Sequence, residues 1–145
     1  MVNFHTSKKI HAPISDVWEI LSDTDREPEF WHGTKSIKNT SRSGNTVERE
    51  VVIAFKNSVC KETVTIEPMK SVTTEITEGP LKGRKTVVIN PDGEKACVVD
   101  VEWDIRLSGF MGMFSKMVKK HILEGTNDAL DRISKALENN QIDDV

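Results

Sequence analysis

The chain has 145 residues, of which 37% are hydrophobic and 30% are charged, and its formal net charge is -3. This length predicts one domain with a substantial core, and the acidic balance argues against a nucleic-acid-binding protein. No apolar run reaches the ~20 residues that cross a bilayer, and the first residues lack a signal peptide's apolar stretch. We therefore expect a cytoplasmic protein without an integral membrane segment.

The N-terminal part predicts one strand and two short helices. Val2, Phe4 and Ile10 fall on one face of a predicted strand over residues 2–11. A turn at residues 12–16 carries residues able to cap the helix predicted over 17–21. A second helical turn, at about 24–27, ends where Pro28 bends the chain.

Residues 34–107 predict six strands that form an antiparallel meander. Turn signals such as Ser43-Gly44-Asn45 and Asn90-Pro91-Asp92-Gly93 divide the β-rich runs at short spacing. In the last strand, 97–107, apolar residues alternate with mostly charged ones. One sheet face should therefore be covered and the other solvated.

A long helix is predicted over residues 111–139, and it should measure about 43 Å at 1.5 Å per residue. Its apolar stripe recurs at three- and four-residue steps, through Phe114, Met117, Val118, His121, Ile122, Gly125, Ala129, Leu130, Ile133 and Leu137. We expect it to cover the apolar sheet face in a single α+β domain over 1–139, followed by an acidic polar tail over 140–145.

The opening IHAPISDVWEILSDTDREPEFW, residues 10–31, and the Trp-containing last strand running through Ser-Gly into a long helix resemble a known superfamily. The chain looks like a START/Bet v 1-like (SRPBCC) protein of the polyketide cyclase/dehydrase and lipid-transport branch. The resemblance implies a helix-grip fold, a seven-stranded antiparallel sheet curled around the C-terminal helix with a cavity between them. Members bind lipids, sterols, polyketides, hormones or quinones, and a minority catalyse cyclisation or dehydration.

In that geometry, the cavity would lie between the apolar sheet face and the inner stripe of the long helix. The residues that we expect to contact a ligand are Trp31, His32, Val64, Ile76, Val87, Ile89, Val99, Val101, Trp103, Phe114, Met117 and His121. The alternative is that these side chains form a filled core, because apolar stripes belong to cores more often than to ligand sites.

Two histidines are the candidate polar anchors. His121 falls on the apolar stripe, where a buried imidazole needs a partner, either a ligand or a sheet hydroxyl such as that of Thr74 or Thr86. His32 follows the Pro28 bend, and is either a rim residue that binds a head group or a surface loop residue. The segment 110–114, Phe-Met-Gly-Met-Phe, either gates the cavity or simply leads into the helix.

No metal site, cofactor or nucleophile motif is expected, because Cys60 and Cys97 are isolated and no cluster has metal-ligand spacing. Our first hypothesis is binding or carriage of a hydrophobic small molecule. The second is a cyclase or dehydratase that uses His121 or His32 as general acid/base, and the third is a protein-interaction or co-chaperone module with an exposed apolar patch. The lack of Tyr and of acid/base groups on the apolar face favours binding; the ligand and the oligomeric state stay open.

Overall fold

A computed structural model describes residues 2–143, with residues 110, 111 and 139–143 described by their backbone alone. It contains one antiparallel sheet of seven strands in the order β1-β7-β6-β5-β4-β3-β2. The strands are β1 (Val2–Ile10), β2 (Thr34–Ser43), β3 (Thr46–Ile53), β4 (Val59–Glu67), β5 (Ser71–Glu78), β6 (Leu81–Pro91) and β7 (Cys97–Leu107).

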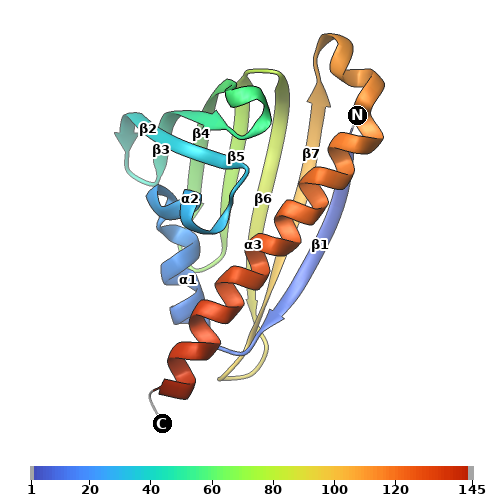
Figure 1. Cartoon of the computed structure of the whole chain (residues 1–145). Coiled ribbons are helices and arrows are strands. Elements are labelled where there is room, and N and C mark those ends of the chain that lie inside the picture. Colours follow the sequence, from blue (N-terminus) through green and yellow to red (C-terminus); the bar gives the residue numbers. More distant parts are fainter. Residues whose placement is uncertain (1, 144–145) are drawn as a thin grey trace.

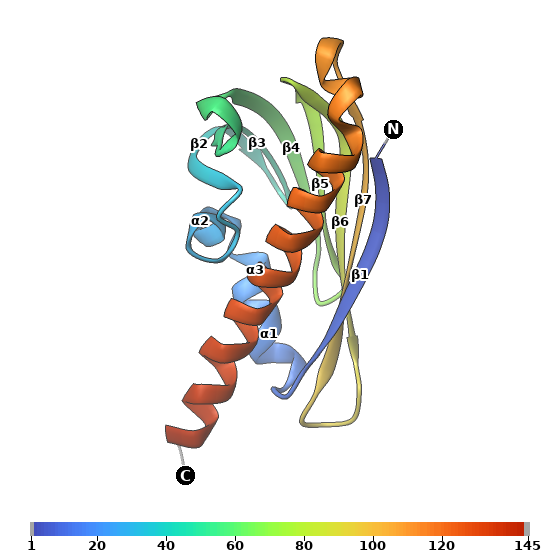
Figure 2. The same cartoon turned by 45° about the vertical axis from the view of Figure 1, so that its right-hand side comes forward.

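The sheet curls around one long helix, α3 (Ser115–Asp143), which runs diagonally in front of β1 and β7 (Figures 1 and 2). After β1 come α1 (Ile14–Ser22), the 3₁₀ helix η1 (Thr24–Arg26) and α2 (Glu27–Phe30). A further 3₁₀ helix, η2 (Phe55–Asn57), joins β3 to β4. This arrangement confirms the predicted helix-grip fold.

Both ends of the long helix differ from the sequence prediction, and α1 begins at Ile14 rather than at residue 17. The long helix begins at Ser115 rather than residue 111, because residues 109–114 form a 3₁₀ helix, η3 (Gly109–Phe114). Gly109 has a φ of 61° and Gly112 lies within this segment, and both weaken α-helix formation there. At the other end, α3 continues to Asp143, past the predicted end at residue 139.

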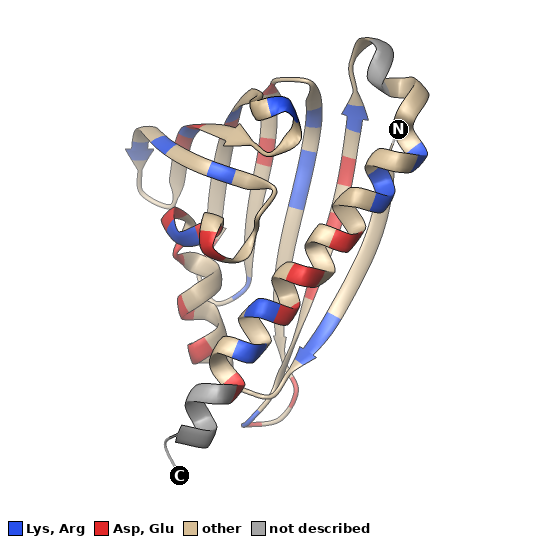
Figure 3. Cartoon of the chain, viewed as in Figure 1, with Lys and Arg blue, Asp and Glu red and all other residues tan. Residues whose placement is uncertain are grey.

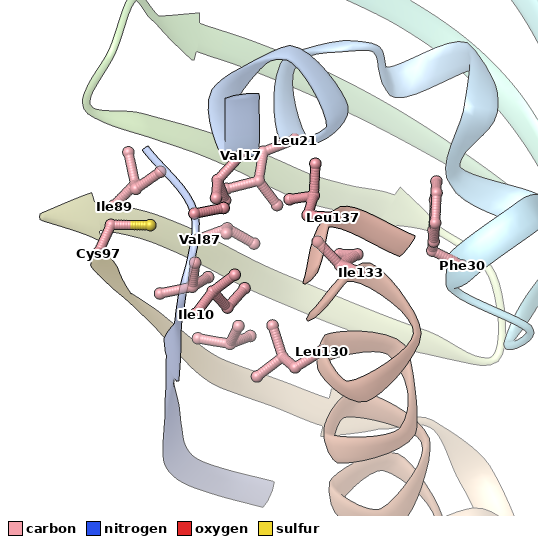
Figure 4. Close-up of a cluster of buried hydrophobic side chains, with 13 residues drawn as sticks. Ile10, Val17, Leu21, Phe30, Val87, Ile89, Cys97, Leu130, Ile133 and Leu137 are labelled. Carbon is pink, nitrogen blue, oxygen red and sulfur yellow. The ribbon is translucent and has the colours of Figure 1, made fainter. Parts of the chain in front are cut away.

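One end of the concave sheet face is filled by a packed apolar core (Figure 4). Side chains from β1, α1, α2, β6, β7 and α3 meet there with almost no exposed surface. We call this cluster the grip core: Ile10, Ala12, Val17, Leu21, Phe30, Val87, Ile89, Cys97, Val99, Val101, Leu130, Ile133 and Leu137.

The helix α3 divides into two halves at Thr126. Its second half has the buried side chains Thr126, Ala129, Leu130, Ile133, Ser134 and Leu137, whereas no residue over 112–125 is buried. Among the described residues, every hydrogen bond or ion pair that joins α3 to another element involves residue 126 or a later one. The first half therefore extends beyond the region where the helix grips the sheet.

Candidate functional site

Five polar residues are buried on the concave face, next to the grip core. Each comes from a different element, and the exposed fraction of every one of them is 8% or less. We call this group the buried polar cluster: Glu27 of α2, Arg49 of β3, Glu62 of β4, Thr74 of β5 and Lys85 of β6.

The strand register brings the cluster together. Arg49 is the cross-strand partner of Glu62, and Lys85 lies between Thr74 on one side and Trp103 of β7 on the other. Along each strand, these residues occupy the alternate positions whose other side chains are apolar and face the concave side. Strand geometry therefore directs the polar side chains to the same face.

Arg49 is 2% exposed and forms ion pairs with two carboxylates at once. Its Nη2 lies 2.9 Å from Glu27 Oε2 and 2.9 Å from Glu62 Oε1, and its Nη1 donates to the Thr24 carbonyl at 3.3 Å. Burial alone lowers the pKa of Arg49, but the two carboxylates more than offset this and raise it, so the guanidinium stays charged.

Glu62 is shifted toward its neutral form. Burial raises the pKa of Glu62, Arg49 opposes the shift, Glu27 adds to it through like-charge repulsion, and Lys85 opposes it. Since one guanidinium is shared between two carboxylates, Arg49 does not fully compensate the burial of Glu62. The cluster therefore contains a carboxyl group able to hold a proton above its usual range.

The ammonium group of Lys85 lies between two indole rings. Its Nζ is 4.0 Å from the ring centre of Trp31 and 5.5 Å from that of Trp103. The Nε1 of Trp103 donates to Thr126 Oγ1 at 3.0 Å, which fixes the second ring against α3. In the described part of the chain, Lys85 has cation–π contacts and no hydrogen bond or ion pair to a protein group.

The hydroxyl of Thr74 is buried without a hydrogen-bond partner among the described residues. Thr74 is 2% exposed and faces Lys85 across the β5–β6 pair. Beside Lys85 is a pocket of about 20 Å³, room for about one water molecule, which Glu27 and Trp31 also line. The site thus contains the unpartnered hydroxyl of Thr74 and, lining a small space, the side chain of Lys85.

The structure separates the residues that the sequence analysis grouped as ligand contacts. Trp31 and Trp103 meet at Lys85, whereas Ile76 lies in a second apolar cluster with Phe4 and Ile105. The side chains packed elsewhere on the concave face are Val87, Ile89, Val99 and Val101 in the grip core and Val64 in a third cluster.

The structure leaves both histidines at the surface, so His121 is not the buried imidazole that the apolar stripe predicted. His121 is exposed, whereas its neighbours Ile122 and Leu123 are half-buried and pack against the second apolar cluster. His32 is also exposed, and its Nε2 lies 3.2 Å from the Glu29 carbonyl oxygen. Phe114 and Met117 are also exposed, at 49% and 54%.

The expectation of few acid/base groups on the concave face is wrong, and no pattern considered above predicted the buried polar cluster. The signal was present in the alternation, since Arg49 stands between Val47 and Val51, and Glu62 between Cys60 and Val64. A charged residue in the inward register of each of two neighbouring strands is rare enough to mark a site.

Other chemistries have weak support in the described residues. They contain no group of three potential metal ligands, and no helix among them is long and apolar enough to span a membrane. Burial raises the pKa of the Cys60 thiol to about 11 and also raises that of Cys97, so both are poor nucleophiles at neutral pH.

Comparisons with known proteins agree with this architecture. No curated protein matches the sequence. Among solved structures, a protein of Thermus thermophilus has a TM-score of 0.80 at 17% identity, covering 95% of this chain and 98% of its own. The Zhui aromatase/cyclase of a Streptomyces species has a TM-score of 0.76 at 14% identity, covering 94% and 93%.

A START superfamily protein of Mycobacterium smegmatis has a TM-score of 0.75 at 19% identity and covers 93% of this chain and 98% of its own. At these identities the likeness shows the fold. The family model described as "Polyketide cyclase / dehydrase and lipid transport" matches residues 1–138. The chain therefore belongs to the polyketide cyclase/dehydrase and lipid transport family.

Proposed function

We propose that the protein binds a small amphiphilic molecule on the concave face of the sheet. Its head group carries an acceptor oxygen, such as a carbonyl or carboxylate, and accepts hydrogen bonds from Lys85 Nζ and Thr74 Oγ1. Its apolar body lies along the second apolar cluster, under the first half of α3. The ligand proposed here is thus the hydrophobic molecule expected from the sequence, with an acceptor head group added.

The observation that carries the proposal is the buried hydroxyl of Thr74, which has no hydrogen-bond partner among the described residues, next to the mostly buried side chain of Lys85, which makes cation–π contacts with two indole rings. A buried polar group without a partner costs about 1–3 kcal/mol. A buried charged cluster also stabilises a fold no better than apolar packing of the same volume, as a rule. Binding of an acceptor at this point accounts for both features.

The neighbouring apolar surface fits the rest of such a ligand. Beyond Trp103 the concave face continues through buried Ile76 to half-buried Ile37 and Ile53, and α3 adds half-buried Ile122. We assign ligand contact to five of the residues expected from sequence: Trp31, Ile76, Trp103, Phe114 and Met117. Five others form the packed wall beneath it: Val64, Val87, Ile89, Val99 and Val101.

The first test is native mass spectrometry of the purified protein, followed by solvent extraction. We expect a co-purifying small amphiphile, or saturable quenching of Trp fluorescence on titration with palmitate or with an aromatic carboxylate. Lys85→Met should weaken binding at least roughly tenfold, since one charge-assisted hydrogen bond contributes about 1.5–3 kcal/mol.

The matched control is Lys82→Met, because Lys82 lies on the same strand but is exposed on the other sheet face. Equal affinity for K85M and K82M would contradict the proposed head-group site. If neither a co-purifying molecule nor binding of either probe is found, the binding proposal fails as a whole.

A second candidate function is acid–base catalysis on the bound molecule, with Glu62 as the proton donor in place of a histidine. The raised pKa of Glu62 favours it, and the structurally similar Zhui protein is an aromatase/cyclase by its name. In this case Glu62→Gln should bind the co-purified molecule with unchanged affinity but fail to convert it. Conversion by E62Q at the wild-type rate would exclude this role.

A further inference from the structure

The free end of α3 carries an exposed apolar patch that the proposed ligand site does not explain fully. Met113 is 80% exposed, Phe114 49% and Met117 54%, and Met113 and Met117 are four residues apart, on successive helical turns. We call these three residues the rim patch. Exposed side chains of this size in a contiguous group mark an interaction surface.

Three lysines accompany the rim patch, and one of them, Lys120, has its Nζ 4.0 Å from Glu124 Oε1. Lys116, Lys119 and Lys120 are exposed on the same turns, and all 23 acidic residues of the chain lie outside residues 105–123. In Figure 3 the charged residues along the first turns of α3 are basic, and both acidic and basic residues follow further along the helix. In a protein of net charge -3, this end is a local basic surface.

A second exposed apolar group lies at the same end of the molecule. The β3–β4 connection and the β7–α3 connection both lie at the upper end in Figure 1. In the former, Phe55 is 39% exposed and Val59 56%, with exposed Lys56 between them. This end therefore presents apolar side chains and lysines from two separate elements.

We propose that this end of the protein docks onto the surface of an anionic lipid bilayer. Phe114, Met113 and Met117 insert at the boundary between head groups and acyl chains, and the three lysines contact the lipid phosphates. Interfacial helices combine insertion of apolar side chains with attraction of basic side chains in the same way. Each lysine near an anionic membrane adds about 1 kcal/mol to the binding free energy.

The charge pattern favours a bilayer over a second copy of the chain. A two-fold contact between two rim patches is self-complementary, so it would bring the lysines of one copy toward the same lysines of the other. Like charges facing each other in this way oppose association. An anionic surface instead neutralises all of them together.

The test is co-sedimentation of the full chain with vesicles of phosphatidylcholine alone and of phosphatidylcholine mixed with phosphatidylserine. We expect binding to the mixed vesicles only, and weaker binding as salt increases, because exposed charges are screened. Met113→Ser/Phe114→Ser/Met117→Ser and Lys116→Glu/Lys119→Glu/Lys120→Glu should each lower the partition coefficient roughly tenfold or more.

Matched controls come from the opposite end of the sheet. Met69, in the β4–β5 turn, is 40% exposed, and Lys70 and Lys95 are exposed in the turns of that end. Met69→Ser and Lys70→Glu/Lys95→Glu should leave vesicle binding unchanged. Circular dichroism of every variant should show that the fold is retained, as expected for exposed positions.

Three outcomes would overturn the proposal: no binding of the wild type to mixed vesicles, equal loss in the control variants, or a concentration-dependent dimer that the rim variants dissociate in the absence of vesicle binding. The last would assign the patch to self-association. Phe114 and Met117 belong to both proposals, so Lys85→Met is the variant that separates them: it should weaken ligand binding and leave vesicle binding unchanged. A wild-type protein that docks but binds no ligand would contradict only the proposed function.

Discussion

The two halves of α3 carry the same kind of apolar stripe, but the structure uses them differently. Leu130 and Ile133 in the second half are at most 1% exposed, whereas Met117 in the first half is 54% exposed. The second half lies over apolar side chains of the grip core, and the first half lies past Trp103, beyond the buried polar cluster. An apolar stripe on a helix thus predicts contact with something apolar, without deciding whether that partner is the protein's own sheet.

The floor of the concave face shows the same division. Under the second half of α3, the side chains of the concave face are apolar, and their burial and close packing stabilise the fold. Next to it, the sheet buries a guanidinium, an ammonium and two carboxylates. Apolar burial should therefore stabilise the fold mainly through one half, and ligand binding and surface recognition should depend on the other.

The largest effect should come from breaking the buried ion pairs. Arg49→Met leaves Glu27 and Glu62 buried without their cation, which we expect to lower the free energy of unfolding by about 3–5 kcal/mol. Urea denaturation measures this loss, and it should shrink at acid pH as Glu62, whose pKa is raised by burial, becomes protonated. The control Arg84→Met breaks the exposed pair with Glu75 and should cost at most about 1 kcal/mol.

The next largest loss in the free energy of unfolding should come from the second half of α3, and it tests the difference between the two halves directly. Leu130→Ala removes a side chain that is 1% exposed, and we expect it to cost about 2–5 kcal/mol. Ile122→Ala, on the half-buried side of the first half, should cost clearly less in the same urea titration. Equal costs would show that the first half of α3 packs in solution as tightly as the second.

A gain in stability should accompany Thr74→Val. The variant keeps the shape of the side chain and removes an unpartnered buried hydroxyl, so the free energy of unfolding should rise by about 1 kcal/mol. Ligand affinity should fall in the same variant. A stability gain without any change in affinity would identify Thr74 as a packing residue alone.

The smallest effect should be a pH dependence that originates at Glu62. Because its pKa is raised in the folded protein, its protonated form favours folding, and this contribution is lost as pH rises through the folded-state pKa. Glu62→Gln should therefore flatten the decline of stability from about pH 4.5 upward, measured by urea denaturation across pH. An unchanged profile in E62Q would assign the decline to another group.

Much of the fold could be predicted because the relevant signals are local. Alternation in 97–107 determines which side chains of β7 face inward, as the burial of Val99 and Val101 shows, and the three- and four-residue stripe predicts a long helix. Both depend only on the geometry of one strand or one helix. The order of elements and the opening motif were sufficient to identify the family.

The candidate site could not be predicted in the same way. Arg49, Glu62, Thr74 and Lys85 come from four strands, and only the register of neighbouring strands decides that they meet. The exposure of His121 likewise depends on where α3 leaves the sheet, which no periodicity within the helix encodes. Periodicity therefore determined what each element looks like, while the tertiary structure alone decided which polar groups it buries together and which apolar ones it leaves in water.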